Sequence, residues 1–506
     1  MLDASASVGL AADGAEIVID SDFENGRLVD YGIADDTVEI GPLNSNRNRW
    51  FSFRISNVKH REVNFVFTWR ERDDLPLVLR VKGNDTAMVS YDGRGYEIVK
   101  DVQWAPETPG AESGRYVQRF SHVFREDEAL IAYAAPWSNT TLDELVRELE
   151  GEPRVVIDNI GHSRFRELPL TYFRLTDPDV PDAEKRSILI VAREDSYEVG
   201  ASWAAEGMIR FLLTDDPVAR ESLRQTIFYI FPLFSVDGVA MGHTNFPLND
   251  TGSQYVYLPA HWNEQPPYHE VALMKAFWHR LKEAGEQVQI LLRPHATCYF
   301  QPHFRPGNYA EHNAADAERL LDTLTQRLPW RVQAGRSTST RGMAYQFLDV
   351  FPEALTLSSH DDFVFTASFL GTDAAVIRRH EDVMQDGELV IRSFAEFNGI
   401  EPTIAPPYLM AGDVSANAVR EGAAVRFSVY YYGVDGLEPA FVNLVVNGRT
   451  YPMQAAGEVD YGRPVLFEHE MVITDSFNDF HFVASNGRRE RRIPQNYDLP
   501  GPFLIP

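Results

Sequence analysis

The feature that most constrains this chain is a regular alternation of strand-like and helix-like segments between about residue 142 and residue 400. Short apolar runs predict buried strands, and apolar residues at every third or fourth position predict helices. The expected strands cover residues 186–192, 226–236, 288–295 and 354–359, and the expected helices cover 142–150, 198–214, 268–285, 314–328 and 381–397. Such alternation is typical of a layered α/β domain with a largely parallel sheet, whose ligands bind at the carboxyl ends of the strands.

The two ends of the chain have a different pattern. Before about Trp137, and again after the proline-rich segment at Pro402, Pro406 and Pro407, apolar and polar residues alternate in short runs between turns. That pattern predicts all-β domains in the form of sandwiches. We therefore expect a β-sandwich at 1–139, an α/β domain at 140–402 and an immunoglobulin-like β-sandwich at 403–506.

Composition narrows the partners and the location. The chain has 506 residues and a formal net charge of −27, which disfavours binding to nucleic acid or to an anionic membrane surface. A single cysteine forbids an internal disulfide. The first residues do not resemble a signal peptide, and no apolar run is long enough to span a bilayer. We expect a soluble cytoplasmic protein.

Polar residues that bind metals or move protons follow two of the expected strands. Asp195 and Glu198 come directly after the strand at 186–192, and His295 ends the strand at 288–295. Carboxylates at this spacing can hold a divalent cation, and histidine is the commonest transition-metal ligand. On spacing alone, an acidic first turn favoured by the helix dipole explains the two carboxylates better.

Short motifs in a fixed order connect these residues to a family. They are Ser21–Leu28, Trp50–Phe53, Ala132-Tyr133, Pro136–Ser138, Ile160–Ser163 and Pro232–Val239. Over roughly residues 20–400 the chain resembles the cytosolic carboxypeptidases, a branch of the zinc metallocarboxypeptidases, and their bacterial relatives. The resemblance implies a metallocarboxypeptidase-like α/β/α domain with a mixed sheet behind an N-terminal β-sandwich. It also implies metal-dependent hydrolysis of C-terminal peptide bonds.

The resemblance assigns a metal site, with one change. In the family motif Ala-Arg-x-His-x-x-Glu, followed later by a His, Asp195 stands at the first His, Glu198 at the Glu and His295 at the last His. An Asp, Glu, His set is less selective for zinc and suits manganese or magnesium as well. The cofactor is therefore expected to be a divalent metal, with zinc possible, or to be absent.

Two further parts of the family site depart from the pattern. Thr366 stands at the position of the general-base Glu, and threonine cannot take a proton from metal-bound water at neutral pH. Asp361 and Asp362, just upstream, are weak substitutes.

The arginines that would grip a substrate carboxylate are also missing, because no Lys or Arg occurs from Gln225 to Met274. That stretch offers His243, Asn245, Asn249 and His261, which favour a neutral or cationic group. Arg293 or Arg305, near His295, is the alternative source of a clamp.

Loss of the clamp, the base and one ligand together indicates lost or changed function. We predict a divergent zinc-carboxypeptidase-like protein without ordinary activity. One alternative is a catalytically inactive pseudoenzyme or binding protein. Another is a hydrolase of an amide or ester that has no free carboxylate. The expected ligand of the protein is a peptide or small molecule. The sequence does not identify a protein partner for the two sandwiches.

Overall fold

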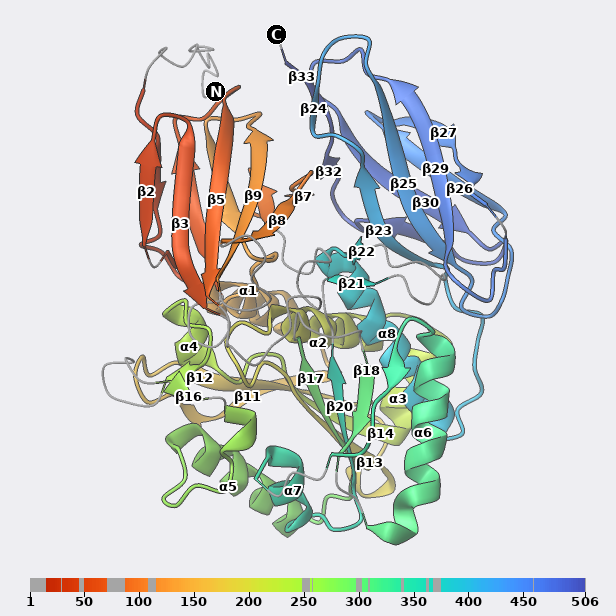
Figure 1. Cartoon of the computed structure of the whole chain (residues 1–506). Helices are drawn as coiled ribbons and strands as arrows, with labels where there is room; N and C mark the ends of the chain where they lie inside the picture. The colour runs from red at the N-terminus through yellow and green to blue at the C-terminus, as the bar shows by residue number, and fades with distance from the viewer. Residues whose placement is uncertain are drawn as a thin grey trace, which may run out of the picture.

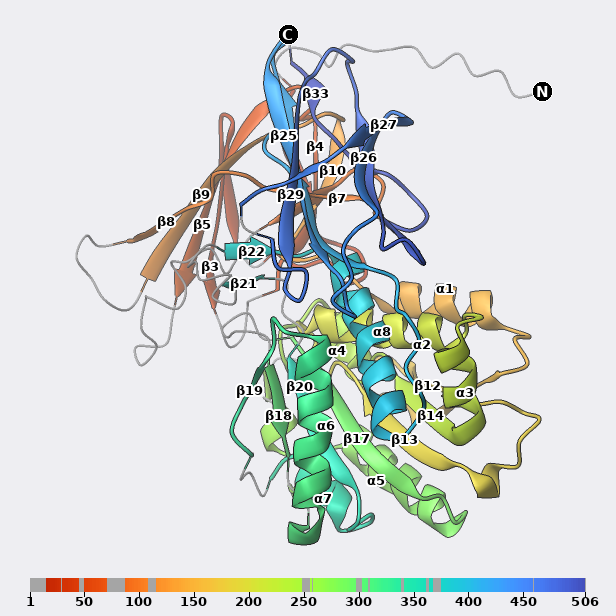
Figure 2. The ribbon, with the colours of Figure 1, turned by 90° about the vertical axis from the view of Figure 1, so that its right-hand side faces the viewer.

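The computed structural model describes most of the chain. The described residues are 15–28, 30–44, 50–70, 87–107, 115–247, 255–256, 258–296, 303–307, 310–337, 341–360, 364–366, 375–457 and 459–505. Two β-rich domains stand side by side, and the α/β domain lies below both of them (Figure 1). The same arrangement is seen after a quarter turn (Figure 2).

The N-terminal domain is a sandwich of two five-stranded sheets. One sheet has the order β1 (Val18–Asp20), β4 (Ser52–Ser56), β10 (Glu128–Ala132), β6 (Met88–Ser90), β7 (Tyr96–Ile98). The other has the order β2 (Tyr31–Ala34), β3 (Thr37–Asn44), β5 (Glu62–Arg70), β9 (Arg115–Val123), β8 (Gln103–Pro106). Side chains such as Phe53, Phe65 and Phe67 alternate into the space between the sheets, as a strand period of two requires.

The α/β domain is built on a mixed eight-stranded sheet. Its order is β11 (Val155–His162), β12 (Pro169–Leu175), β14 (Thr226–Phe231), β13 (Arg186–Val191), β17 (Val288–His295), β20 (Leu355–His360), β18 (His303–Pro306), β19 (Val332–Gln333). The central strands β14, β13, β17 and β20 are parallel. Their residues are buried almost without exception, because helices cover both faces of such a sheet.

Eight α-helices belong to the described part of this domain. They are α1 (Asn139–Leu149), α2 (Val199–Leu212), α3 (Pro217–Gln225), α4 (Val236–Ala240), α5 (His269–Glu283), α6 (Ala314–Arg327), α7 (Met343–Leu348) and α8 (His380–Phe397). Two short pairs lie outside the main sheet: β15 (Phe246–Pro247) with β16 (Tyr255–Val256), and β21 (Val364–Thr366) with β22 (Ala375–Ile377). Helix α8 packs against α2, α3 and α6 and is buried over nearly its whole length.

The C-terminal domain has two main sheets with a core of their own. One contains β23 (Tyr408–Val414), β25 (Ala424–Tyr432), β29 (Val465–Val472) and β28 (Gln454–Ala455). The other contains β27 (Arg449–Pro452), β26 (Phe441–Val446), β30 (Asp479–Ser485) and β31 (Glu490–Ile493), with β32 (Leu499–Pro500) also paired to β30. A short pair joins β24 (Ala418–Val419) to β33 (Phe503–Leu504).

Polar contacts fix the C-terminal domain to the other two. Lys100 of the N-terminal sandwich lies 2.5 Å from Asp413. Arg491 donates to Glu388 on α8 at 2.7 Å, in a partly buried ion pair. The buried Arg379, which precedes α8, donates to the carbonyl oxygens of both Tyr96 and Gly412. One side chain therefore joins all three domains.

The expected fold class is confirmed: a metallocarboxypeptidase-like α/β domain with a mixed sheet lies between two β-rich flanks. The helix expected over 142–150 begins earlier, at Asn139. Ser138 is the N-cap, and its side chain and that of Thr141 form a reciprocal capping box. The exact domain boundaries stay a prediction. No described helix is long and apolar enough to cross a membrane.

Candidate functional site

The candidate site is built on the turn between β13 and α2. Arg193 adopts a left-handed backbone conformation with φ of 62°, which is uncommon for a residue with a side chain. Its fully buried guanidinium donates to the carbonyl oxygens of Ser196 at 2.8 Å and Trp137 at 3.2 Å, and to the hydroxyl of Ser202 at 3.2 Å. Arg193 therefore ties the turn both to helix α2 and to the exit of the N-terminal sandwich.

The same turn is held closely from the other side by α4. A Cβ atom on Gly238 would lie 1.9 Å from the hydroxyl oxygen of Ser196, so only glycine fits there. Asp237 accepts hydrogen bonds from the hydroxyl of Ser163 at 2.6 Å and the amide of Phe165 at 2.8 Å. These contacts explain why the Asp-Gly pair follows β14: it locks the β11–β12 hairpin against the site turn.

Glu194 is the most heavily bonded acid in the turn. Its Oε1 accepts a hydrogen bond from the indole of Trp262 at 2.7 Å, and its Oε2 accepts from Nε of Arg293 at 2.7 Å. A second Arg293 nitrogen, Nη2, also contacts Oε2. Glu194 is fully buried and Arg293 is 8% exposed, so this is an interior ion pair.

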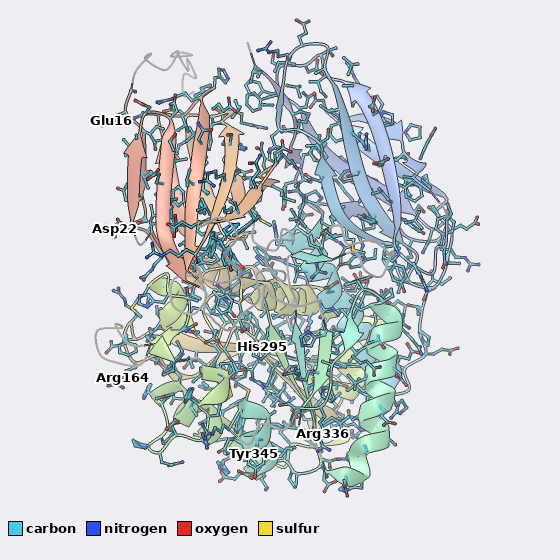
Figure 3. The ribbon with its side chains drawn as sticks, in the orientation of Figure 1. Glu16, Asp22, Arg164, His295, Arg336 and Tyr345 are labelled. Atoms are coloured by element: carbon cyan, nitrogen blue, oxygen red, sulfur yellow. The ribbon has the colours of Figure 1, made fainter. Side chains whose placement is uncertain are left out.

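His295 lies between two of the carboxylates. Its Nδ1 is 2.9 Å from Oε2 of Glu198, and its Nε2 is 3.4 Å from Oε2 of Glu194. Arg293 and His295 point to the same side because residues two apart in a strand share a face. His295 lies within the α/β domain, on the side towards the two sandwiches (Figure 3).

Asp195 shares this interior but lacks good partners. Among the described residues, neither Asp195 oxygen nor Oε1 of Glu198 has a well-aligned hydrogen bond, and only the amides of Leu258 and Phe246 lie near enough to Asp195 to act on it. Burial raises the pKa of Asp195 well above its ordinary value, and the charges of Glu198 and Glu194 raise it further, whereas the amides of Leu258 and Phe246 oppose the rise. Burial, followed by the charge of Glu194, likewise raises the pKa of Glu198.

The segment expected to line a substrate pocket packs directly on the turn. The carbonyl oxygen of Thr244 accepts from the amide of Tyr197 at 3.2 Å, and its hydroxyl accepts from the amide of Trp50 at 3.1 Å. The carbonyl oxygen of Asn245 lies 3.4 Å from the hydroxyl of Ser196. The backbone of Asn245, a predicted substrate-binding residue, is therefore beside the turn, and the N-terminal sandwich contacts the neighbouring Thr244.

The remaining substrate-binding predictions are scattered. His243 is buried, and burial together with the charge of Arg27 lowers its pKa to about 4. His261 lies near the surface, 3.2 Å from Glu264. Asn249 is outside the described residues. Arg305, the alternative clamp, is an exposed residue of β18, whereas Arg293 is engaged by Glu194.

The predicted general-base position lies away from the eight-stranded sheet. Thr366 is on β21, which pairs only with β22, and Asp361 and Asp362 are outside the described residues. Within the main sheet, the residue paired with His295 across the parallel strands β17 and β20 is His360. The assignment of Thr366 stays a prediction.

The side chains at the predicted metal positions meet only in part. Glu198 and His295 are in contact, but no three His, Cys, Asp or Glu residues in the described part of the chain are arranged as ligands of one ion. Both nitrogens of His295 face carboxylates of this chain, and the guanidinium of Arg293 already pairs with one of these carboxylates. In this arrangement the residues do not fit a zinc ion.

The sequence interpretation overlooked Glu194 and Trp262. Glu194 filled a spacer position in the motif and was given no role. A usable signal was present, because Glu194 comes shortly after the largely apolar strand β13 and Arg293 lies two residues before His295 on the adjacent parallel strand. Trp262 gave no comparable signal, since only the fold brings its indole to Glu194.

The fold and the strand-end site together define a metallocarboxypeptidase-like protein. Residues 142–279 match the family described as zinc carboxypeptidase, Peptidase_M14. A metallo-carboxypeptidase from Burkholderia cenocepacia has a similar structure, with a TM-score of 0.62, 18% identity, and coverage of 76% of this chain and 99% of that one. One from Pseudomonas aeruginosa has a TM-score of 0.55 at 19% identity, covering 76% and 99%.

Curated relatives point to one branch of that family. Human cytosolic carboxypeptidase 6 is 23% identical over 426 residues, which cover 77% of this chain and 80% of the relative. Cytosolic carboxypeptidase 2 of Danio rerio is 25% identical over 258 residues, which cover 45% of this chain but only 34% of the relative. The chain is therefore similar to the zinc carboxypeptidases, and among them to the cytosolic carboxypeptidase-like branch. That family is zinc-dependent.

Proposed function

We propose that this protein keeps the carboxypeptidase architecture but does not hydrolyse ordinary C-terminal peptide bonds, and that it acts as a binding protein. The observation that carries the proposal is the pairing of Arg293 with Glu194, at 2.7 Å in the protein interior. A guanidinium is the usual group for gripping a substrate carboxylate. The Arg293 guanidinium already has an internal carboxylate, so it is not available to grip one from a substrate.

Burial of the site supports the same conclusion. Glu194, Asp195 and Glu198 are fully buried, and His295 is 3% exposed. A substrate carboxylate brought beside three acids would lose its hydration without gaining a counter-charge, which is strongly unfavourable. The pocket thus favours a neutral or cationic group of a peptide or small molecule, contacted through polar residues such as His243 and Asn245.

A hydrolase of an amide or ester without a free carboxylate is the second candidate. It is favoured by three buried carboxylate oxygens, two on Asp195 and one on Glu198, that have no well-aligned hydrogen bond within the described part of the chain. Buried polar atoms normally have partners, so such oxygens are suited to a ligand donor. This candidate predicts turnover of neutral substrates that depends on Glu198.

The proposal extends to the setting of the protein. A net charge of −27 disfavours nucleic acid and anionic membranes as partners, so a protein or a small molecule is the expected ligand. The names of the cytosolic relatives support a cytoplasmic location.

The test is release of free amino acids from a peptide panel, with zinc and with manganese. We expect the wild-type protein to release no more than its Glu198→Ala variant. A Glu353→Ala variant, altered at an exposed residue far along the chain, is the control for substitution itself. Robust turnover by the wild type and by Glu353→Ala, abolished in Glu198→Ala, would refute the proposal.

A calorimetric titration separates the two pocket chemistries. Paired peptides that differ only in a terminal carboxylate or carboxamide should bind with a preference for the carboxamide. Tighter binding of the carboxylate, lost in Arg293→Ala or Arg305→Ala, would show that a clamp is available after all.

A further inference from the structure

We infer that the Arg293 guanidinium, held by Glu194, is an internal cation that takes the place of the metal ion in this site. The inference deepens the proposed function and rests on it. It assigns to Glu194, which occupies an unassigned position of the sequence motif, the role of positioning the Arg293 guanidinium. It also explains why the carboxyl ends of the central strands keep their acids while the ligand set has changed.

The first support is the position of the guanidinium. Arg293 is two residues before His295 on β17 and points to the same face of the sheet. Glu194 follows β13, which is parallel to β17 and pairs with it directly. The ion pair therefore lies at the carboxyl ends of two neighbouring strands, which is where this kind of fold places a ligand.

The second support is the environment of His295. Nδ1 faces Glu198 at 2.9 Å, and Nε2 faces the same Glu194 oxygen that accepts from Arg293, at 3.4 Å. Arg293, Glu194, His295 and Glu198 thus form one chain of contacts. A metal could bind His295 only if a ring nitrogen separated from the carboxylate that it faces, because each nitrogen already contacts one.

The third support is that Glu194 cannot easily turn away. Its other oxygen accepts the Trp262 indole hydrogen at 2.7 Å. Trp262 is fully buried and stacks on Trp278, with ring centroids 5.6 Å apart, and on Phe234 at 5.7 Å. Glu194 is held by a packed ring on one side and a guanidinium on the other. A divalent ion beside this fixed positive charge would be repelled.

The test measures zinc affinity and metal content in the full chain purified without chelator. The ion-pair variants are Arg293→Met and the double variant Glu194→Gln/Arg293→Met. Each is made in the wild-type chain and in an Asp195→His background, and Asp195→His is also measured alone. The double variant removes both charges of the ion pair, so it avoids leaving Glu194 buried and unpaired. Arg331→Met is the matched control. Arg331 also forms a buried ion pair, at 2.6 Å, but its partner is Asp386 on α8 and not an acid of the site. Circular dichroism and thermal melting confirm that each variant is folded.

We expect substoichiometric zinc in the wild type and in Asp195→His alone. Removing the ion pair in the Asp195→His background should tighten zinc binding at least about tenfold, the scale on which groups around a metal change its affinity. Arg331→Met should leave the zinc affinity and the zinc content unchanged. One zinc per wild-type chain, or tight zinc binding by Asp195→His that the ion-pair variants do not improve, would overturn the inference. Zinc without peptide cleavage would overturn this inference alone, whereas cleavage would overturn the proposed function.

Discussion

Replacing Asp386 tests whether the C-terminal domain is an integral part of the fold. Asp386 on α8 accepts from Arg331 and from Arg378, each at 2.6 Å, and from the hydroxyl of Tyr408 on β23 at 2.7 Å. Asp386 and both guanidinium groups are buried. The two guanidinium groups lower the pKa of Asp386 despite its burial, so it is ionised at neutral pH.

The expected cost of Asp386→Ala follows from what it leaves behind. Two buried guanidinium groups would lose their counter-charge, and removing one partner of a buried ion pair typically costs about 3–5 kcal/mol. The lost Tyr408 hydrogen bond adds about 1 kcal/mol. Asp386→Asn should cost nearly as much, because it keeps the shape but not the charge.

The measurement is urea unfolding followed by tryptophan fluorescence, with hydrogen exchange across α8 and β23. Trp330 lies 4.6 Å from the ring of Tyr408, so it reports on this contact. Glu468→Ala is the control, since its pair with Arg426 at 3.4 Å is largely exposed and worth less than about 1 kcal/mol. If the free energy of unfolding of Asp386→Ala is within about 1 kcal/mol of the wild-type value, the buried network does not hold the C-terminal domain. Because Asp386 has a depressed pKa, its contribution should be present above the unfolded-state pKa of about 4 and lost as pH falls through the folded value.

Two further changes probe other parts of the molecule. Gly238→Ala should destabilise the protein by about 1–3 kcal/mol and disturb the site turn, because its methyl group would meet Ser196. A thermal melt should show a clearly lower melting temperature. Gly335→Ala is the control and should melt like the wild type, because its methyl group would meet no atom within 4 Å. Burial raises the pKa of Glu97, which lies beside His122, to about 8. The protonated form of Glu97 is therefore favoured in the folded protein. Its contribution to stability is fully present below pH 4.5 and is lost as pH rises through about 8. Glu97→Gln should therefore be more stable than the wild type at pH 9, by about 2–4 kcal/mol, with little difference at pH 5; equal stability at both values would contradict the assignment.

Much of the central domain could be predicted from the sequence because its elements are long and strongly periodic. Strand β17 spans Val288–His295 as expected, and helix α5 agrees to within a few residues. The strand expected over 226–236 ends earlier, at Phe231. Pro232 cannot donate to a ladder, and the chain then turns into α4.

The site was harder to predict because its contacts depend on register between strands. The sequence shows that Asp195, Glu198 and His295 follow strands, but not which atoms meet. The pairing of β13 with β17 brings Arg293 to Glu194, and this pairing depends on which strands become neighbours. Spacing within one segment contains no such information.

The retained acids and the altered ligand set have a common physical explanation. A buried carboxylate is stable only with a nearby positive charge or a proton, so loss of a metal should eliminate the acids around it unless another cation is present. Arg293 supplies that charge to Glu194, and His295 lies between Glu194 and Glu198. Arg193 and Trp262 hold the turn from either side. The acids of the site then reflect the requirements of the fold, and their presence alone does not indicate catalysis.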